Sequence, residues 1–322
     1  MRATAVAHPN IALVKYWGKA DVKKNLPAVG SISITLDTLT TTTSVRLDSE
    51  LDRDELVLDG QPASDERTAR ARFCLDLFRR HRPDLPPVLV ESENSFPTAA
   101  GLASSASGFA ALVTALNAVL ESPLGGDELV EISRRCSGSA PRSLYGGYVE
   151  LALDGDGTTV RPILDRQEWP LEVVIAITSK VAKVVGSTEG MELTRTTSDF
   201  YESWVSSSSD DLAAARTAIE ARDFQALAAV AETSCLKMHA VAMAARPGLM
   251  YWNGATVECL HRVRELRCGG VPVFFTIDAG PQLKAVCDPG SSDHVAAALS
   301  EIPGVVEIVR CGLGDGARVV EG

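Results

Sequence analysis

The order of apolar and polar positions along this chain predicts both strands and helices. Residues 32–47 alternate between apolar or β-branched and polar side chains, which is typical of strands. Residues 64–82 carry apolar side chains at helical spacing, with Asp65 and Glu66 in the first turn and arginines near the end. By the same criteria, further strands are expected at 55–58, 88–90, 146–153, 171–178, 273–277 and 305–310. Further helices are expected at 102–120, 127–136, 210–222, 223–245, 255–267 and 294–300.

These elements follow one another in an irregular order that does not fit a repeated strand–helix–strand series. We therefore expect an α+β fold. The length of 322 residues allows two domains or one two-lobed unit. Composition changes near residues 160–170, which include Pro162 and Pro170, but no linker rich in Pro, Gly and Ser divides the chain.

One long stretch raises the question of a membrane span. Residues 94–120 contain no charged side chain and are long enough to cross a bilayer. The same stretch holds Pro97, Asn117, two glycines and several hydroxyl side chains, which favour a buried helix preceded by a polar loop. We therefore expect no membrane partner. The N-terminal residues lack a signal-peptide core, and the seven cysteines have no paired spacing, so we expect a reduced, cytoplasmic protein.

The charge of the chain excludes one class of partner and points to another. Its formal net charge is −11, which argues against nucleic acid as a partner, because phosphate contacts need clustered basic residues. Six of the eight lysines nevertheless fall in two short stretches, at 15–24 and 180–183. The charge pattern alone leaves open a solvated cluster or a local pocket for an anion, to which an ammonium is suited.

A run of small residues at 97–108 has the chemistry of a phosphate-binding loop. Gly101 permits a tight backbone, the helix that follows exposes its first N–H groups, and Ser104, Ser105 and Ser107 supply hydroxyls for phosphate or Mg²⁺. The run is neither a Walker A loop nor a dinucleotide fingerprint. The alternative is a small-residue helix start that packs against a sheet.

Two further segments place charged groups where chemistry is common. Arg142 lies in a glycine-rich turn with Ser137 and Ser139, where a guanidinium can clamp a carboxylate or phosphate. Asp278 follows an apolar strand and is a candidate general base or metal ligand. Each residue also fits an ordinary polar turn, and the residues alone do not decide between the two interpretations.

Taken in order, several segments resemble the diphosphomevalonate (mevalonate diphosphate) decarboxylase family of the GHMP kinase superfamily. These segments are 10–19 (Asn-Ile-Ala-Leu-Val-Lys-Tyr-Trp-Gly-Lys), 97–108, 137–147, 187–191 and 278–281 (Asp-Ala-Gly-Pro). The first and last are the more specific, and the resemblance covers nearly the whole chain. It implies a two-lobed GHMP kinase fold with the active cleft between the lobes. The expected lobes are a ribosomal protein S5 domain 2-like lobe at 1–165 and a ferredoxin-like lobe at 166–322.

The resemblance implies an activity: ATP-dependent conversion of mevalonate 5-diphosphate to isopentenyl diphosphate, CO₂, ADP and phosphate, in the mevalonate pathway of isoprenoid biosynthesis. Asp278 then matches the catalytic aspartate near the C3 hydroxyl, Arg142 the carboxylate-holding arginine, and Lys15 a lysine beside the catalytic carboxylate. The positions that match the substrate pocket are Tyr16, Lys19, Ser137, Ser139, Arg142, Ser187, Thr188 and Met191. The ATP phosphates would lie on Pro97, Ala100, Gly101, Ala103, Ser104, Ser105 and Ser107, with Ser105 as the Mg²⁺ contact. The resemblance also implies a homodimer.

Two alternative functions stay open on the sequence. Some relatives carry an arginine where this chain has Thr188, which removes one possible contact to the substrate diphosphate. The first alternative is therefore a related enzyme whose substrate has fewer phosphates. That enzyme would be a phosphomevalonate decarboxylase or a mevalonate 3-kinase. The second alternative is a non-catalytic ATP-binding sensor on the same fold. Arg142 together with Asp278 argues against a pure kinase, and Lys15, Arg142 and Asp278 together disfavour the sensor, while the phosphorylation state of the substrate stays open.

Overall fold

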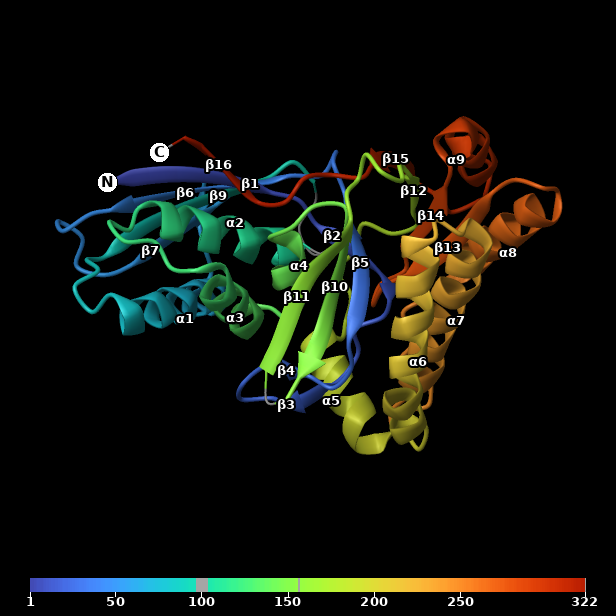
Figure 1. Cartoon of the computed structure of the whole chain (residues 1–322), viewed down its shortest axis with the longest axis horizontal. Coiled ribbons are helices and arrows are strands. Elements are labelled where there is room, and N and C mark those ends of the chain that lie inside the picture. The colour runs from blue at the N-terminus through green and yellow to red at the C-terminus, as the bar shows by residue number, and fades with distance from the viewer. Residues whose placement is uncertain (97–103, 156, 322) are drawn as a thin grey trace.

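The computed structural model describes residues 1–96, 104–155 and 157–321 (Figure 1). A six-stranded sheet in the order β16-β1-β6-β9-β7-β8 lies at one end of the molecule. Its strands are β1 (Arg2–Ala7), β6 (Thr41–Leu47), β7 (Glu55–Leu58), β8 (Gln61–Pro62), β9 (Val88–Asn94) and β16 (Arg318–Glu321). One face is covered by α1 (Asp65–His81), α2 (Ser104–Ala118) and α3 (Gly126–Cys136).

The core of this end follows from the side-chain patterns of its elements. On β6 the inward positions Thr41, Thr43 and Val45 are buried, and the intervening residues are not. Val45 packs with Phe78 of α1 and Leu116 of α2 in one apolar cluster. The apolar side chains of alternate strand positions therefore pack against those at helical spacing on the helices, on one face of the sheet.

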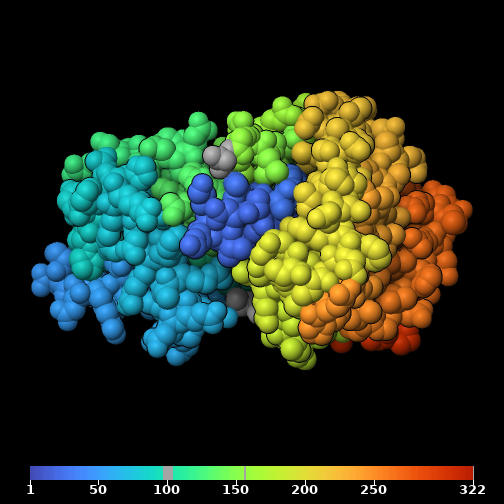
Figure 2. Space-filling view, turned by 90° about the horizontal axis from the view of Figure 1, so that it is seen from below, coloured from blue at the N-terminus to red at the C-terminus, as the bar shows by residue number. Residues whose placement is uncertain are grey.

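A second sheet occupies the centre of the molecule in the order β11-β10-β5-β2. Its strands are β2 (Asn10–Val14), β5 (Ser31–Thr35), β10 (Tyr148–Asp154) and β11 (Gly157–Leu164). The hairpin β3 (Lys19–Asp21) and β4 (Leu26–Pro27) leaves this sheet between β2 and β5, and the short helix α4 (Ala140–Ser143) precedes β10. In Figure 2 the blue N-terminal segment lies between the cyan and green half of the molecule and its yellow and orange half.

A third sheet, fully antiparallel, has the order β13-β14-β12-β15. Its strands are β12 (Glu172–Ile177), β13 (Val273–Ile277), β14 (Leu283–Cys287) and β15 (Glu307–Gly312). The helices of this half are α5 (Ser187–Thr197), α6 (Tyr201–Glu220), α7 (Phe224–Met243), α8 (Gly254–Cys268) and α9 (Ser292–Ser300), with a 3₁₀ turn η1 (Pro289–Ser291) before α9. Helix α7 packs against both β13 and β2, so the second and third sheets share one apolar core.

Most of the predicted elements are present, and two need correction. Residues 32–47 form two strands in different sheets. The chain leaves the first strand at Leu36 and Asp37, where Leu36 bridges to Leu313 and the Asp37 carboxylate accepts the Gly312 N–H. The helix predicted at 210–222 begins at Tyr201, and its first half is rich in serine. Within the described residues, no helix combines the length and apolarity that crossing a membrane requires.

Candidate active site

Asp278 lies directly after β13 and faces two lysines from different strands. The Lys15 Nζ, just past the end of β2, lies 2.6 Å from one carboxylate oxygen of Asp278. The Lys284 Nζ, on β14, lies 3.1 Å from the other oxygen. Both lysine side chains are 1% exposed and that of Asp278 is 26% exposed. The carboxylate is therefore held from two sides while part of it stays open to a ligand.

The two ammonium groups decide the charge state of Asp278. Burial acts to raise the pKa of Asp278, but Lys15 and Lys284 outweigh it and hold this pKa well below its usual range. Burial lowers the pKa of Lys284, and the nearby Asp278 opposes that shift. Asp278 is therefore ionised at neutral pH, where it can accept a hydrogen bond and supply negative charge.

Arg142, on α4, is buried at 2% exposure among neutral partners. Its guanidinium donates to the hydroxyls of Ser33 (3.0 Å) and Ser31 (2.5 Å) and to the Asn10 side-chain oxygen (3.3 Å). Within the described ranges no carboxylate forms an ion pair with Arg142, and burial lowers its pKa to about 10. A buried cation without an anionic partner is costly, which is the arrangement expected of a site for an anionic ligand.

Tyr16 and the 137–139 turn meet beside Arg142. The Tyr16 hydroxyl is buried without a hydrogen-bond partner in the described structure, and burial raises its pKa to about 12. A Cβ on Gly138 would lie 2.3 Å from this hydroxyl, so only glycine allows the approach. The Ser137 hydroxyl lies 3.3 Å from that of Ser139 and 3.5 Å from that of Ser105. Four predicted hydroxyl-bearing residues therefore gather in one region.

The start of α5 approaches Asp278 through Lys183. The Lys183 ammonium donates to the Ser187 hydroxyl (2.7 Å) and to the Ala279 carbonyl (2.9 Å), and burial lowers its pKa. Of the other predicted residues on α5, Met191 is buried in a neighbouring apolar cluster and Thr188 is exposed at the first turn. This helix therefore joins the site through Ser187.

The lysine clustering in the sequence is only partly reflected in the site. Lys19, on β3, is half-buried, and its pKa is lowered by burial and by the nearby Arg70. Lys180 instead forms an exposed ion pair with Glu307 (2.8 Å), and Lys24 is among the exposed lysines. Of the clustered lysines, Lys15 and Lys183 lie near Asp278, where Lys284 joins them.

The serine-rich loop is described only from Ser104 onward. Pro97, Ala100, Gly101 and Ala103, predicted to contact ATP phosphates, lie outside the described residues. Ser104 begins α2 and Ser105 is exposed next to Ser137. Ser107 is fully buried, and its hydroxyl lies 2.7 Å from that of Thr41, so it joins α2 to β6.

Sequence reasoning missed Lys284, Asn10, Ser31 and Ser33. The signal for Lys284 was a single charge inside the otherwise apolar run 283–287. Ser31 and Ser33 alternate with apolar residues, which suggests a solvent-facing side, but strand β5 is fully buried. Buried polar groups of this kind need partners, and here the partners are Asp278 and Arg142.

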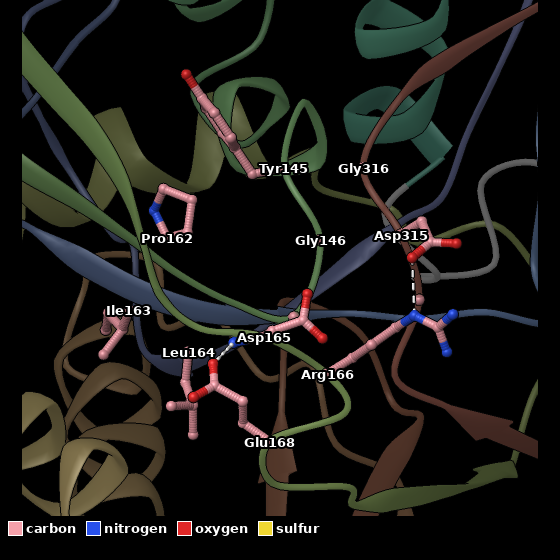
Figure 3. A pocket seen from close by; sticks show the side chains of 12 residues that line it. Tyr145, Gly146, Pro162, Ile163, Leu164, Asp165, Arg166, Glu168, Asp315 and Gly316 are labelled. Carbon is pink, nitrogen blue, oxygen red and sulfur yellow. Dashed lines mark hydrogen bonds and ion pairs between the residues drawn. The ribbon is translucent and has the colours of Figure 1, made fainter.

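Figure 3 shows a cavity of about 340 Å³ that contains none of the predicted residues. It lies between the segment that follows α4, the end of β11 and the residues before β16. Its basic residue, Arg166, pairs with Asp315 at 2.7 Å, and the lining also holds the carboxylates of Asp165 and Glu168. Because its cation is already paired and its other charges are negative, this cavity is a weaker candidate for an anionic ligand than the Asp278 region.

Models of known protein families match both halves of the chain. Residues 7–161 match the diphosphomevalonate decarboxylase-like N-terminal domain, and residues 173–307 match the mevalonate 5-diphosphate decarboxylase C-terminal domain. The diphosphomevalonate decarboxylase of Saccharomyces cerevisiae is 37% identical over 302 residues, which cover 87% of this chain and 76% of the relative.

Solved structures extend the likeness to the whole fold. The mevalonate diphosphate decarboxylase of Staphylococcus aureus has a TM-score of 0.93 and 34% identity, covering 99% of this chain and 98% of the other. A structure of MDDEF in complex with MVAPP, AMPPCP and magnesium has a TM-score of 0.92 and 34% identity, covering 100% and 99% of the two chains. The chain therefore has the GHMP kinase fold and belongs to the diphosphomevalonate decarboxylase family.

Proposed function

We propose that this protein is an ATP-dependent diphosphomevalonate decarboxylase. It converts mevalonate 5-diphosphate and ATP to isopentenyl diphosphate, CO₂, ADP and phosphate. The observation that carries the proposal is the ionised Asp278 held by Lys15 and Lys284, with Arg142 as a buried cation that lacks an anionic partner among the described residues. Family membership supports the same activity.

The first chemical step is phosphoryl transfer to the tertiary C3 hydroxyl. The hydroxyl oxygen forms a bond to the γ-phosphorus, the bond to ADP breaks, and the hydroxyl proton passes to solvent water. Asp278 orients this hydroxyl and accepts its hydrogen bond. Because two lysines depress the pKa of Asp278, its contribution is orientation and charge rather than strong basicity.

The second step is loss of phosphate and CO₂. The C3–O bond breaks as phosphate leaves, which produces a tertiary cation near the negative charge of Asp278. The bond from C2 to the carboxylate then breaks, and its electron pair forms the C2–C3 double bond as CO₂ departs. Arg142 holds the carboxylate in line. Its other partners are neutral oxygens, so charge-assisted hydrogen bonds to the substrate meet no competing anion there.

The remaining groups are assigned to substrate binding. We place the substrate diphosphate against residues at the mouth of the site that carry hydroxyl or ammonium groups: Tyr16, Lys19, Ser137, Ser139, Ser187 and Thr188. The free hydroxyl of Tyr16 supports this assignment most directly, because a buried hydroxyl normally has a partner. Met191 supplies an apolar wall.

ATP would bind at the start of α2. Ser104 and Ser105 lie at this helix N-terminus, where backbone N–H groups favour an anion. Pro97, Ala100, Gly101 and Ala103 belong to the same proposed phosphate loop. Bound Mg²⁺ neutralises phosphate charge, and it would be held mainly by phosphate oxygens with the Ser105 hydroxyl. A family structure in complex with AMPPCP and magnesium supports this proposal.

The proposal extends to the lobes, the oligomeric state and the cellular location of the enzyme. We propose two lobes that meet near residue 165, a homodimer, and a cytoplasmic location for the protein. The seven cysteines of the described structure are all free thiols, which supports a reducing compartment. Light scattering of the purified protein measures the oligomeric state directly, and a monomer would contradict the dimer.

One assay decides between the candidate activities. The purified protein is incubated with ATP, Mg²⁺ and one of mevalonate, its 5-phosphate or its 5-diphosphate, while CO₂ and ADP are measured together. We expect equal amounts of both products, and the highest kcat/KM with the diphosphate. ADP without CO₂ would identify a kinase, and a preference for the monophosphate would identify the related decarboxylase. Neither product, with ATP still bound, would identify a sensor.

The variant Asp278→Asn provides the matched control for this assay. It keeps the size of the side chain and removes its charge. We expect turnover to be abolished while the affinity for an ATP analogue changes by less than about threefold, since the proposed phosphate loop is untouched. Full activity in this variant would contradict the role of Asp278.

A further inference from the structure

Strand β13, which ends one residue before Asp278, is the edge strand of its sheet. Side chains of α7 satisfy its outer backbone groups. The Glu232 carboxylate accepts the Phe275 N–H (3.2 Å), and the Cys235 sulfur accepts the Ile277 N–H (3.2 Å). The His239 Nε2 lies 3.1 Å from the Ile277 carbonyl oxygen. The helix thus takes the place of a neighbouring strand.

The spacing of Glu232, Cys235 and His239 explains how a helix can do this. They occupy positions i, i+3 and i+7, which share one face of an α-helix. The seven steps from Glu232 to His239 rise about 10.5 Å along the helix, which more than spans the roughly 7 Å between Phe275 and Ile277 and leaves Cys235 and His239 both within reach of Ile277. One helix face can therefore run beside Phe275 to Ile277. We call these three side chains the α7 ladder.

The last member of the ladder is a neutral histidine. His239 is 1% exposed, and burial lowers its pKa to about 3, so the ring is uncharged at neutral pH. A carbonyl oxygen can only accept, so Nε2 carries the hydrogen and donates it to Ile277. Nδ1 then has no hydrogen and, within the described chain, no partner. His239 therefore fixes the backbone one residue before Asp278.

Ser234, the residue before Cys235 on α7, contacts the backbone of Lys15, the other member of the ion pair. Ser234 is fully buried, and its hydroxyl accepts the Lys15 N–H at 3.0 Å. A further bond, from the Thr276 hydroxyl to the Ala12 carbonyl (3.0 Å), joins the two strands that precede Lys15 and Asp278. One helix therefore contacts the backbone of Lys15 and that of Ile277, the residue before Asp278, although the ion pair spans 263 residues of the chain.

We propose that α7 sets the distance between Lys15 and Asp278, with His239 and Ser234 as positioning residues. This inference rests on the function proposed above, because it concerns the geometry of that reaction. Reacting groups need near-contact alignment, and a displacement of about 1 Å can cost about 10²-fold in rate. The effect belongs to kcat, since neither positioning residue contacts the proposed phosphate-binding groups.

The test compares His239→Leu, which removes the donor, with His239→Gln, whose amide nitrogen can replace Nε2. We expect His239→Leu to lower kcat about 10²-fold and to leave both KM values within about threefold. His239→Gln should recover kcat to within about tenfold of the wild type. Ser234→Ala is a smaller change that keeps the packing, and we expect it to lower kcat about tenfold. If His239→Leu fails to fold, the kcat of Ser234→Ala tests the proposal in its place.

Val263→Ala is the matched control, because Val263 is equally buried in the apolar cluster that contains Cys235 and its side chain has no hydrogen-bonding group. We expect its kcat to stay within about threefold of the wild type. An equal loss in Val263→Ala would assign the effect to packing and overturn the proposal. So would an unchanged kcat in folded His239→Leu, or a failure of glutamine to rescue it.

A readout independent of turnover separates this inference from the proposed function. Crystal structures of the wild type and of His239→Leu, or of Ser234→Ala in its place, measure the Lys15 Nζ to Asp278 Oδ1 distance, which is 2.6 Å here. We expect it to lengthen beyond about 3.5 Å, outside hydrogen-bond range. An unchanged distance overturns the inference, whether or not the wild type releases CO₂.

Discussion

Lys284 lies 3.1 Å from the Asp278 oxygen that Lys15 does not contact, so each carboxylate oxygen has its own ammonium. Two buried lysines around one carboxylate leave a net positive charge before any ligand binds. An incoming phosphoryl group is negatively charged, so this excess can stabilise it electrostatically as well as hold Asp278.

Replacing Lys284 by methionine should change the pH dependence of turnover. The folded-state pKa of Asp278 lies below its ordinary value, so wild-type Asp278 stays ionised until the pH falls well below 4. With one ammonium removed, this pKa rises, and the acidic limb of the kcat profile moves to higher pH. Lys237→Met is the control, because Lys237 pairs with Asp211 on α6. Coincident profiles for wild type and Lys284→Met would exclude the second lysine from the control of Asp278.

Arg142→Lys should reduce CO₂ release sharply. An ammonium cannot reproduce the planar fork that contacts Ser31, Ser33 and the proposed substrate carboxylate together. We expect kcat/KM to fall about 10²-fold, which corresponds to about 2.7 kcal/mol. Arg161→Lys, at a residue whose side chain is 57% exposed, should be nearly silent. Near-normal decarboxylation by Arg142→Lys would count against the carboxylate clamp.

Gly138→Ala should weaken substrate binding by displacing Tyr16. The new Cβ would lie 2.3 Å from the Tyr16 hydroxyl, so the ring must move. We expect KM for mevalonate 5-diphosphate to rise about tenfold, or about 1.4 kcal/mol. Gly126→Ala is the matched control, because a Cβ there meets no atom within 4 Å. Equal KM values in the two variants would remove Tyr16 from the proposed diphosphate site.

Glu150→Gln should lower stability in a pH-dependent way. Glu150, on β10, is fully buried and pairs with Arg216 of α6 and Arg161 of β11. Burial acts to raise the pKa of Glu150, but the two guanidiniums outweigh it and hold the pKa below its usual value. This contribution to stability is therefore present above the unfolded pKa of about 4.3 and is lost as the pH falls further.

We expect urea unfolding at pH 7 to show a loss of about 2 kcal/mol in Glu150→Gln. The difference from the wild type should stay constant between pH 7 and about 5 and shrink as the pH falls from about 5 towards about 3. Glu93→Gln, at an exposed position of β9, should stay within about 0.5 kcal/mol of the wild type. A loss that is constant across this pH range would show that the charge of Glu150 is not its source.

The sequence predicted elements best where one face of the element meets solvent. Helix α1 and strand β6 have a polar side, so their periodicity is visible. Strands β2 and β14 are fully buried, so they lack the alternation that marks a strand, and they were missed; the equally buried β13 was predicted from its β-branched and aromatic side chains. A short apolar run of this kind gives no period to recognise.

The site was predictable where single segments carry the chemistry, and not where the fold brings distant residues together. Arg142 and Asp278 stand in glycine-rich or strand-end segments that attract attention by themselves. Lys284 and His239 acquire their meaning from contacts across the third sheet and α7. In the sequence, Lys284 and His239 each look like an isolated polar residue in an apolar stretch. The pattern of residues does not reveal which distant residue each one contacts.

The pairing of β16 with β1 has a consequence for how this chain is made. Glu321 lies opposite Thr4, and Arg318 lies opposite Val6, so β1 gains this neighbour from residues far along the chain. During synthesis that edge of β1 stays open, and an open edge can pair with another chain. The N-terminal sheet is therefore completed only after residues 318–321 have been synthesised, and until then β1 is an edge open to pairing with another chain.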